Sequence, residues 1–533
     1  MVFHGKNFIG SQFSASGGKL IYGFNPRTGK QLDEGFHEAT PEEIDRALAL
    51  AESAFPILRE SPPERVAEFL EAIAGEIEAL GDELLERAST ESGLTKERLT
   101  GERGRTTSQL RMFANVVSEG SFVGASIETA LPDRKPAARP DLRRMLIPIG
   151  PVAVFGASNF PLAFSVAGGD TASALAAKNP VIVKAHPAHP GTSELVAGAL
   201  LTAVRKTGMP EGTFSMVHTA DPELSLSLVK HPATKAVGFT GSERAGRAIF
   251  NAAAQRPNPI PAYVEMGSNN PVFVLPGALK MSLDSIVQGL FGSITLGVGQ
   301  FCTSPGVVIG NADRSFQEFG EKLAALFEKG QPGTMLHPSI AKGYRENVEH
   351  RAETIGVSVI RSAEKGDVEK TETTPVLFQT DAGVWLKNRE LANEIFGPSA
   401  VLVRSNSRDQ LLRIAGEWSG TLTATIFGTP EDLEENRDLV AILQTKAGRL
   451  IFNGFPTGVE VGNAMHHGGP YPATGDAKFT SVGTAAILRF LRPVCFQNFP
   501  EKSLPAELQS GNPRGIWRLL NGELTKAACD RLG

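Results

Sequence analysis

The chain carries two kinds of hydrophobic pattern, one helical and one alternating. Residues 40–118 place apolar side chains at helical spacing, and Thr40 with Glu43 three positions later forms a capping-box pattern at the start. From residue 151, short apolar runs such as "PVAVFG", "PVIVKA" and "KAVGFTG" alternate with helical stretches. This alternation predicts a parallel sheet covered by helices on both faces, and such sheets bind ligands at the carboxyl ends of their strands.

A second alternating region covers residues 270–454, with "NPVFVL", "PGVVIG", "AVLVRS" and "LTATIFG" as predicted strands. Residues 121–150 differ from both regions, because they are proline-broken and extended. The tail that begins at "FTSVGTAAILRFLRPV" returns to an extended pattern. We expect these two extended segments to pair through free strand edges with another subunit.

Composition narrows the class of protein. A chain of 533 residues is too long for one hydrophobic core, and a net charge of −5 with mixed signs indicates no nucleic-acid surface. No apolar run approaches about 18 residues, and no signal peptide is indicated, so we expect no membrane span. Three distant cysteines argue against disulfides and favour a reducing, cytoplasmic location.

Polar residues stand where the predicted parallel strands end. Asn159 follows "VAVFG", Lys184 follows "VIV", and Glu265 follows "AYV". The stretch "FTGSERAG" links a strand to a helix, with glycines that let a ligand approach the backbone and a helix N-terminus that can face a pyrophosphate. Cys302 lies in "GVGQFCTSP", after a glycine-rich approach that leaves room for a reactive thiol.

These motifs resemble those of the aldehyde dehydrogenase superfamily, in the same order along the chain. They are "ASNFP", "VKAH", "FTGS", "VEMGS", "GQFC" and "NEIFGP". Further stretches, such as "ERGRTTSQLR" and "VGTAAILRFLRPV", resemble the branch that oxidises 2-oxoglutarate semialdehyde (2,5-dioxovalerate) and includes some NADP-linked fatty aldehyde dehydrogenases. Two departures stand out: Ser158 replaces a common Trp, and "GGPYPATGD" at 468–476 replaces a usual glycine-rich stretch of the substrate wall.

The resemblance implies an α/β architecture with a Rossmann-type cofactor domain, an α/β catalytic domain and a small extended oligomerisation element. Homodimers or homotetramers are expected. The cofactor domain is predicted at 1–120 and 149–267, the catalytic domain at 268–455, the oligomerisation element at 121–148 and 478–500, and a C-terminal extension at 501–533.

The resemblance also implies the catalytic roles. Cys302 is the nucleophile, the Asn159 amide and the Cys302 backbone N–H hold the oxyanion, and Glu265 activates the hydrolytic water. We expect the apolar neighbours Val264 and Met266 to raise the pKa of Glu265. Cys495 and Cys529 are interpreted as packing residues. No metal is expected, because the pairs His186 with His189 and His466 with His467 lack further ligands nearby.

NADP is the favoured cofactor, with NAD as the alternative. Pro187 stands where many NAD-specific relatives carry an acidic residue that would repel a 2′-phosphate, although Asp221 and Glu223 lie nearby in "ADPELS". Lys184 is expected at the adenosine ribose, Ser242 at the pyrophosphate, and Glu394 with Phe396 at the nicotinamide end. The predicted cofactor residues are Lys184, His186, Thr240, Gly241, Ser242, Gly246, Glu394 and Phe396.

The expected substrate is 2-oxoglutarate semialdehyde, which is oxidised to 2-oxoglutarate. An acidic aldehyde needs a cation, and Arg103, Arg105 and Arg111 are candidates on one predicted helix, with Phe160 as a further substrate residue. Arg103 and Arg111 are eight residues apart and share a helix face. The alternatives are an aliphatic aldehyde, acyl transfer to coenzyme A, and a catalytically silent binding or structural protein with this fold.

Overall fold

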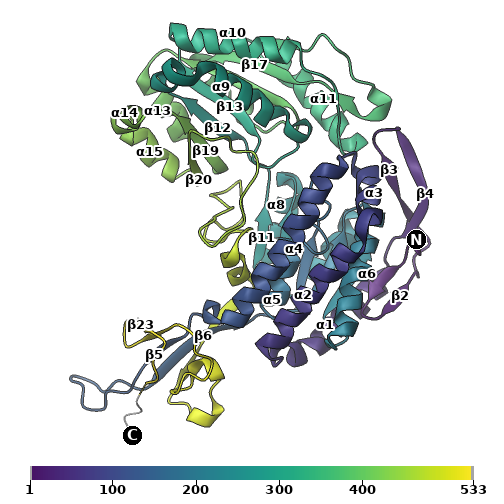
Figure 1. Ribbon diagram of the computed structural model, residues 1–533, viewed down its shortest axis with the longest axis vertical. Helices are drawn as coiled ribbons and strands as arrows, with labels where there is room; N and C mark the ends of the chain where they lie inside the picture. Colours follow the sequence, from purple (N-terminus) through teal and green to yellow (C-terminus); the bar gives the residue numbers. More distant parts are fainter. Residues whose placement is uncertain (1–2, 530–533) are drawn as a thin grey trace.

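A computed structural model describes residues 3–529 (Figure 1). The first two residues of the predicted cofactor domain and the last four of the predicted C-terminal extension lie outside this range. The predicted α/β class is confirmed: the strands of residues 3–529 form two seven-stranded sheets, one five-stranded sheet and two two-stranded ribbons.

The first large sheet has the strand order β11-β10-β7-β8-β9-β1-β2. Its central strands run parallel, whereas β1 joins β9 in the antiparallel direction. The register sets Phe155 beside Lys184 and Thr240 beside Glu265, so these strand ends are level with one another. The strands are β1 (Asn7–Ile9), β2 (Gln12–Ser14), β7 (Val152–Phe155), β8 (Val181–Ala185), β9 (Phe214–His218), β10 (Ala236–Thr240) and β11 (Ala262–Glu265).

Helices cover both faces of this sheet, because neighbouring residues of each buried strand point to opposite sides. Val152 and Val154 pack into one hydrophobic cluster with α2 and α6, whereas Ala153 and Phe155 pack into another with α1 and α8. The predicted capping box is present, since the Thr40 hydroxyl accepts from the Glu43 N–H and the Glu43 carboxylate from the Thr40 N–H. The helices are α1 (Pro41–Arg59), α2 (Pro63–Ala79), α3 (Gly81–Ser92), α4 (Lys96–Glu119), α5 (Gly169–Ala176), α6 (Pro190–Lys206), α7 (Pro222–Lys230) and α8 (Glu243–Ala254).

The second large sheet has the order β15-β17-β18-β13-β12-β19-β20, and all its strands lie within residues 268–455. It is parallel except at β15. Its strands are β12 (Asn270–Val274), β13 (Pro305–Asn311), β15 (Ser358–Arg361), β17 (Val376–Asp381), β18 (Ser399–Ser405), β19 (Thr421–Phe427) and β20 (Ala447–Phe452). Its helices are α9 (Pro276–Thr295), α10 (Arg314–Glu328), α11 (Pro338–Ala352), α12 (Ala382–Trp385), α13 (Arg408–Glu417), α14 (Pro430–Glu435) and α15 (Arg437–Gln444).

The third sheet extends away from the other two and contains both segments with the extended pattern (Figure 1). Seven residues of β21 pair antiparallel with β6. The C-terminal extension contributes two more strands, because β22 pairs with β5, a pairing that the sequence did not indicate. The strands are β5 (Ser126–Glu128), β6 (Leu142–Pro148), β21 (Leu491–Gln497), β22 (Arg518–Leu520) and β23 (Glu523–Thr525). The ribbons are β3 (Leu20–Asn25) with β4 (Lys30–His37), and β14 (Gly333–Thr334) with β16 (Glu372–Thr373).

One helical segment of the described chain, Pro276–Gly299, is long and apolar enough to cross a membrane by length and composition alone. The sequence pattern predicted no such segment. In this fold its inner side packs on the second sheet, through Ile286, Val287, Leu290 and Ile294. The segment leads directly into the turn that carries Cys302.

Candidate active site

The carboxyl ends of the first sheet open into a cavity of about 770 Å³. Lys184 is the last but one residue of β8, Thr240 ends β10 and Glu265 ends β11, while Asn159 follows β7 after a short loop. All four line the cavity together with Cys302. The parallel register therefore brings residues that are distant in sequence to one edge, as the strand pattern predicted.

Cys302 lies in a tight turn between η2 (Leu296–Gly299) and β13. The Asn270 side chain at the start of β12 donates to the carbonyls of Cys302 and Ser304, each at 2.9 Å, and fixes this turn to the second sheet. Gly299 has φ +66°, and a Cβ there would lie 2.3 Å from the Gly397 carbonyl. The glycine-rich approach is thus required by a close backbone contact as well as by access to the thiol.

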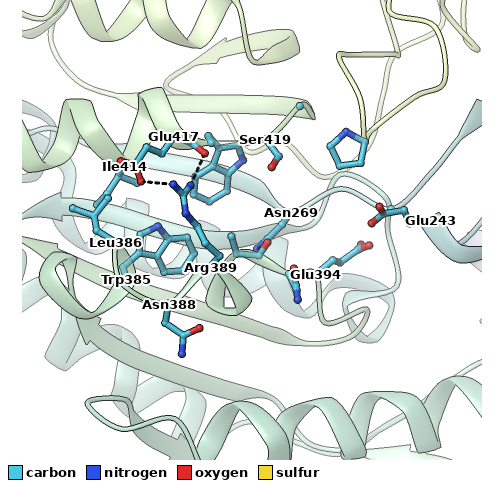
Figure 2. Close-up of a pocket in the computed structure, with 16 residues that line it drawn as sticks. Glu243, Asn269, Trp385, Leu386, Asn388, Arg389, Glu394, Ile414, Glu417 and Ser419 are labelled. Atoms are coloured by element: carbon cyan, nitrogen blue, oxygen red, sulfur yellow. Dashed lines mark hydrogen bonds and ion pairs between the residues drawn. The ribbon is translucent and has the colours of Figure 1, made fainter. Parts of the chain in front are cut away.

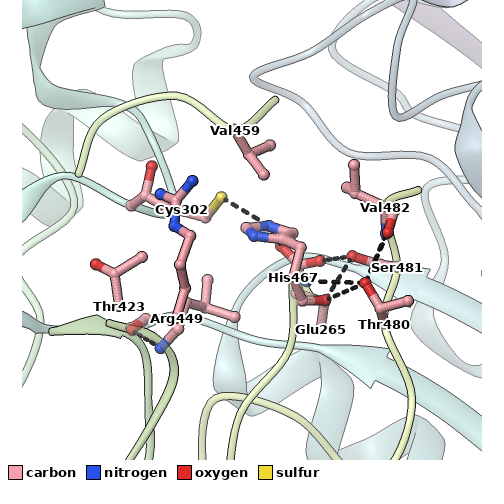
Figure 3. Close-up of polar contacts among 12 residues, drawn as sticks. Glu265, Cys302, Thr423, Arg449, Val459, His467, Thr480, Ser481 and Val482 are labelled. Carbon is pink, nitrogen blue, oxygen red and sulfur yellow. Dashed lines mark hydrogen bonds and ion pairs between the residues drawn. The ribbon is translucent and has the colours of Figure 1, made fainter. Parts of the chain in front are cut away.

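The thiol of Cys302, the ring of His467 and the carboxylate of Glu265 lie close together (Figure 3). The Cys302 Sγ lies 3.6 Å from His467 Nε2, and the same nitrogen lies 2.9 Å from Glu265 Oε1. The Ser481 hydroxyl donates to the other Glu265 oxygen. Glu265 and His467 are only 3% and 2% exposed, so these contacts act in a water-poor setting.

The electrostatics of the group correct the expectation for Glu265. Burial alone would raise the pKa of this carboxyl, but the His467 ring and the hydrogen bonds from His467 and Ser481 outweigh it, so the pKa lies below its ordinary value. Val264 and Met266 are buried in the core below, and they do not decide the shift. Burial and the charges of Glu265 and Glu394 raise the pKa of the Cys302 thiol well above its ordinary value.

The Asn159 amide is held next to the thiol from two sides. Its Nδ2 donates to the Gln300 carbonyl at 3.0 Å, and Arg98 donates to the Asn159 carbonyl at 2.9 Å. Within residues 3–529, no hydrogen bond is recorded for the backbone N–H of Cys302. That N–H and the second hydrogen of the Asn159 amide are therefore free to receive an oxyanion.

The predicted cofactor residues fit a dinucleotide in this cavity. Ser242 caps the first turn of α8, which offers free N–H groups to a pyrophosphate. Burial lowers the pKa of Lys184 to about 8. Burial and the charge of Glu243 raise the pKa of Glu394 to about 8. The predicted residues that line the cavity are Lys184, His186, Thr240, Gly241, Ser242, Glu394 and Phe396.

Gly246 has a different role from the one predicted. It lies in α8 and is not among the residues that line the cavity. A Cβ at this position would lie 2.5 Å from the Met266 side chain. This glycine therefore lets α8 pack closely on the strand that carries Glu265. Gly267 is similarly constrained, since a Cβ there would lie 2.1 Å from a Glu394 oxygen.

A second cavity of about 430 Å³ shares Gly267 and Glu394 with the first (Figure 2). Trp385 and Trp418 stack there with ring centroids 5.6 Å apart, and Arg389 pairs with Glu417 at 3.0 Å. Neither Cys302 nor Glu265 lines this cavity, so it lies outside the cluster around the thiol.

The three candidate arginines of α4 point in different directions, which corrects the prediction for two of them. Arg111 pairs with Glu78 and Glu71, at 2.7 and 3.3 Å, and Arg103 donates to the Gly81 carbonyl. Arg105 instead donates to the carbonyl of Val459, next to Gly458, whose N–H donates to Thr303, the residue after Cys302. The shared helix face of Arg103 and Arg111 thus turns toward α2 and α3, away from the thiol.

Phe160 lies beside the cysteine turn, with its ring edge-on to Phe301 at 5.4 Å. The Arg98 guanidinium lies over both rings, at 4.9 and 4.5 Å. The sequence pattern did not indicate four of the residues that position this site: Arg98, Asn270, His467 and Ser481. Of these residues, only His467 could have been noticed in the sequence, because it immediately precedes the divergent stretch 468–476. It was considered there only as a metal ligand.

Residues 13–478 match the aldehyde dehydrogenase family, and the chain belongs to this family. Two relatives align along nearly the whole chain. It is 48% identical to alpha-ketoglutaric semialdehyde dehydrogenase 2 of Azospirillum brasilense, over 98% of this chain and 100% of the relative. It is 45% identical to alpha-ketoglutaric semialdehyde dehydrogenase of Acinetobacter baylyi, over 98% and 99% of the two chains.

Solved structures of lower identity share the fold. An aldehyde dehydrogenase from Bacillus cereus matches with a TM-score of 0.79 at 22% identity, over 92% of this chain and 96% of that one. A 1-pyrroline-5-carboxylate dehydrogenase from Thermus with bound NAD matches with a TM-score of 0.78 at 20% identity, over 92% of both chains. The family uses NAD(P), which agrees with the fit of the cavity.

Proposed function

We propose that this protein oxidises 2-oxoglutarate semialdehyde to 2-oxoglutarate with NAD(P). The observation that carries the proposal is the cluster of Cys302, Glu265 and Asn159 around one cavity, in a chain 48% and 45% identical to two alpha-ketoglutaric semialdehyde dehydrogenases. An intact nucleophile, base and oxyanion donor argue against a silent binding protein.

The reaction begins with a thiol whose proton must be removed. The raised pKa of Cys302 keeps the resting thiol protonated, and the lowered pKa of Glu265 keeps the carboxylate ionised. Glu265 is therefore the adjacent group that can accept the thiol proton, and the transfer is driven by the attack of sulfur on the aldehyde carbon. His467 orients the carboxylate for this transfer, since its Nε2 contacts both Sγ and Oε1. The new C–S bond leaves an oxyanion, which the Asn159 amide and the Cys302 N–H stabilise.

Oxidation and hydrolysis follow at the same carbon. A bound NAD(P)⁺ supplies the hydride acceptor. As the oxyanion re-forms its C=O bond, the C–H bond breaks and a thioester remains on Cys302. Glu265 releases the thiol proton to solvent and then takes a proton from water, whose oxygen attacks the thioester carbon. The C–S bond breaks, the carboxylate product is freed, and Cys302 sulfur recovers a proton from Glu265. A hydrolytic base at this position disfavours transfer of the acyl group to coenzyme A.

We propose NADP as the preferred cofactor, with NAD also accepted. The acidic residues near the adenosine end are engaged elsewhere: Glu194 accepts from the backbone N–H groups of His4 and Gly5, and Asp221 caps α7. Arg244, absent from the sequence prediction, lines the cavity with Lys184. The positive charges of Lys184 and Arg244 therefore favour the binding of a 2′-phosphate.

We also propose a cytoplasmic homodimer or homotetramer. The location is supported by the three distant cysteines, none of which forms a disulfide. The oligomer is supported by the free edge of β20, where Leu450 and Phe452 are 37% and 43% exposed, and by the outer edge strand β21 of the third sheet. Free strand edges of this kind are commonly covered in oligomers.

A panel of aldehydes tests substrate and cofactor together. We expect kcat/KM for 2-oxoglutarate semialdehyde to exceed that for pentanal by about 100-fold or more, and NADP to match or exceed NAD. The measurement is the aldehyde-dependent rise in absorbance of the reduced cofactor. Preference for pentanal or a long-chain aldehyde would refute the substrate, a clear NAD preference would refute the cofactor, and dependence on coenzyme A would refute the hydrolytic step.

A further inference from the structure

Two half-buried arginines near the thiol have buried guanidinium nitrogens without hydrogen-bond partners. The first belongs to Arg105 on α4. Its Nη1 donates to the Val459 carbonyl, whereas its Nε and Nη2 are buried and make no hydrogen bond within residues 3–529. Burial lowers the pKa of Arg105, and negative charge at Cys302, Glu102, Glu460 or Glu265 acts in the opposite direction.

The second group belongs to Arg449, which extends from β20 toward Cys302 (Figure 3). Its Nη2 donates to the carbonyls of Pro456 and Gly458, at 2.8 and 3.0 Å. Its Nε is buried and has no hydrogen-bond partner among the described residues. Burial lowers its pKa, and the charge of Cys302 acts in the opposite direction.

Both arginines hold the same loop, residues 456–459, from different sides. The backbone N–H of Gly458 donates to the hydroxyl of Thr303 at 3.1 Å, which ties this loop to the residue after the nucleophile. The helix α4 and the edge strand β20 therefore each place one arginine near Cys302.

No carboxylate of the described chain satisfies either cation. No ion pair within residues 3–529 includes Arg105 or Arg449. The buried Glu102 acts on Arg105 at a distance, but its bonded oxygen accepts from the N–H groups of Leu162 and Ala163. A buried guanidinium N–H without an acceptor is costly, and a carboxylate is the acceptor that best matches its geometry.

We infer that Arg105 and Arg449 bind the carboxylate at the far end of the aldehyde substrate, while its aldehyde carbon lies at Cys302. Arg105 makes the larger contribution, because two of its nitrogens are free and Arg449 has one buried free nitrogen. This inference rests on the proposed function, since it assigns the acidic end of the proposed substrate to named residues.

The test compares an acidic and a neutral aldehyde in matched variants. For each enzyme, the selectivity is kcat/KM for 2-oxoglutarate semialdehyde divided by kcat/KM for pentanal. We expect Arg105→Gln to lower this ratio by about 100-fold, mainly through KM, and Arg449→Gln by about 10-fold. Arg105→Lys, which keeps the charge without the fork, should recover part of the ratio.

Arg103→Gln is the matched control on the same helix, because Arg103 donates to a backbone carbonyl away from the thiol. Its ratio should equal that of the wild type. A ratio unchanged in Arg105→Gln, or equal losses with both aldehydes that Arg105→Lys does not recover, would overturn the inference and leave a merely structural role for loop 456–459. The proposed function fails separately, if the wild-type enzyme itself does not favour the acidic aldehyde.

Discussion

Two regions of the active site hold their side chains by different means. The first is the strand edge, where Lys184, Thr240 and Glu265 lie at the carboxyl ends of parallel strands of one sheet. The second is the irregular segment 456–481, which contributes Val459, His467 and Ser481. In the strand edge the sheet register alone fixes position. In the segment, position depends on contacts with residues distant in sequence.

The two regions meet at Glu265. The Thr474 backbone bridges to Glu265, and the backbone N–H of Met266 donates to Ala473 at 2.8 Å. The strand edge thus supplies the carboxylate, whereas the segment supplies the ring and hydroxyl that lower its pKa. We conclude that the sheet supplies the carboxylate of Glu265 and that the segment sets its pKa. The following substitutions test these two roles separately.

The largest effect is expected at the strand edge itself. Glu265→Gln removes the base while keeping the side-chain volume, so steady-state turnover should fall by about 1,000-fold. Because Glu265 also takes the thiol proton in the first step, rapid mixing should show the first equivalent of reduced cofactor forming more slowly than in the wild type, with thioester left on Cys302 afterwards. A first equivalent at the wild-type rate would confine Glu265 to hydrolysis, and a slow first equivalent with no thioester on Cys302 would show that the hydrolytic role is wrong.

A smaller effect is expected in the segment. His467→Asn removes the largest contribution that lowers the pKa of Glu265, and burial then raises this pKa against only the hydrogen bonds from Ser481 and Cys302. Glu265 becomes ionised only at higher pH, so the acidic limb of the kcat profile should move to higher pH, with turnover about 10-fold lower near neutrality.

The control for this prediction is His466→Asn, the adjacent histidine, for which the described contacts show no bond to Glu265 or Cys302. Its pH profile should match the wild type. An equal fall in kcat at all pH values in His467→Asn would indicate a packing role for His467. It would then be wrong that the segment sets the pKa of Glu265.

Sequence reasoning succeeded where local pattern dictates position and failed where tertiary contacts do. The alternation of strands and helices predicted the first sheet, and with it the gathering of Lys184 and Glu265 at one edge. Helical periodicity predicted that Arg103 and Arg111 share a face, but periodicity cannot say which face turns to the site, and the structure turns Arg105 there. His467 reaches Glu265 across 202 positions of sequence, a distance over which no spacing rule operates.

The smallest predicted effect is on stability and concerns Glu394. Its pKa is raised, whereas the pKa of Glu265 is lowered. Burial raises the pKa of Glu394 to about 8, so the folded enzyme without cofactor favours the neutral carboxyl. The contribution of this group to stability is fully present below its unfolded pKa, near 4.5, and is lost as the pH rises toward and through about 8. Glu265 has a lowered pKa, so its contribution is present at neutral pH and is lost only on acidification.

Glu394→Gln removes the ionisation and should therefore raise the melting temperature more at pH 8.5 than at pH 5, by about 1–3 °C. The effect stays small because the carboxyl opens onto the cavity, where water screens its charge. Glu265→Gln should instead lower the melting temperature near neutral pH, since the buried contacts of His467 and Ser481 lose their anion. Thermal unfolding of both variants across this pH range measures the contrast, and shifts of the same sign would show that the two carboxyls do not differ in the way their surroundings imply.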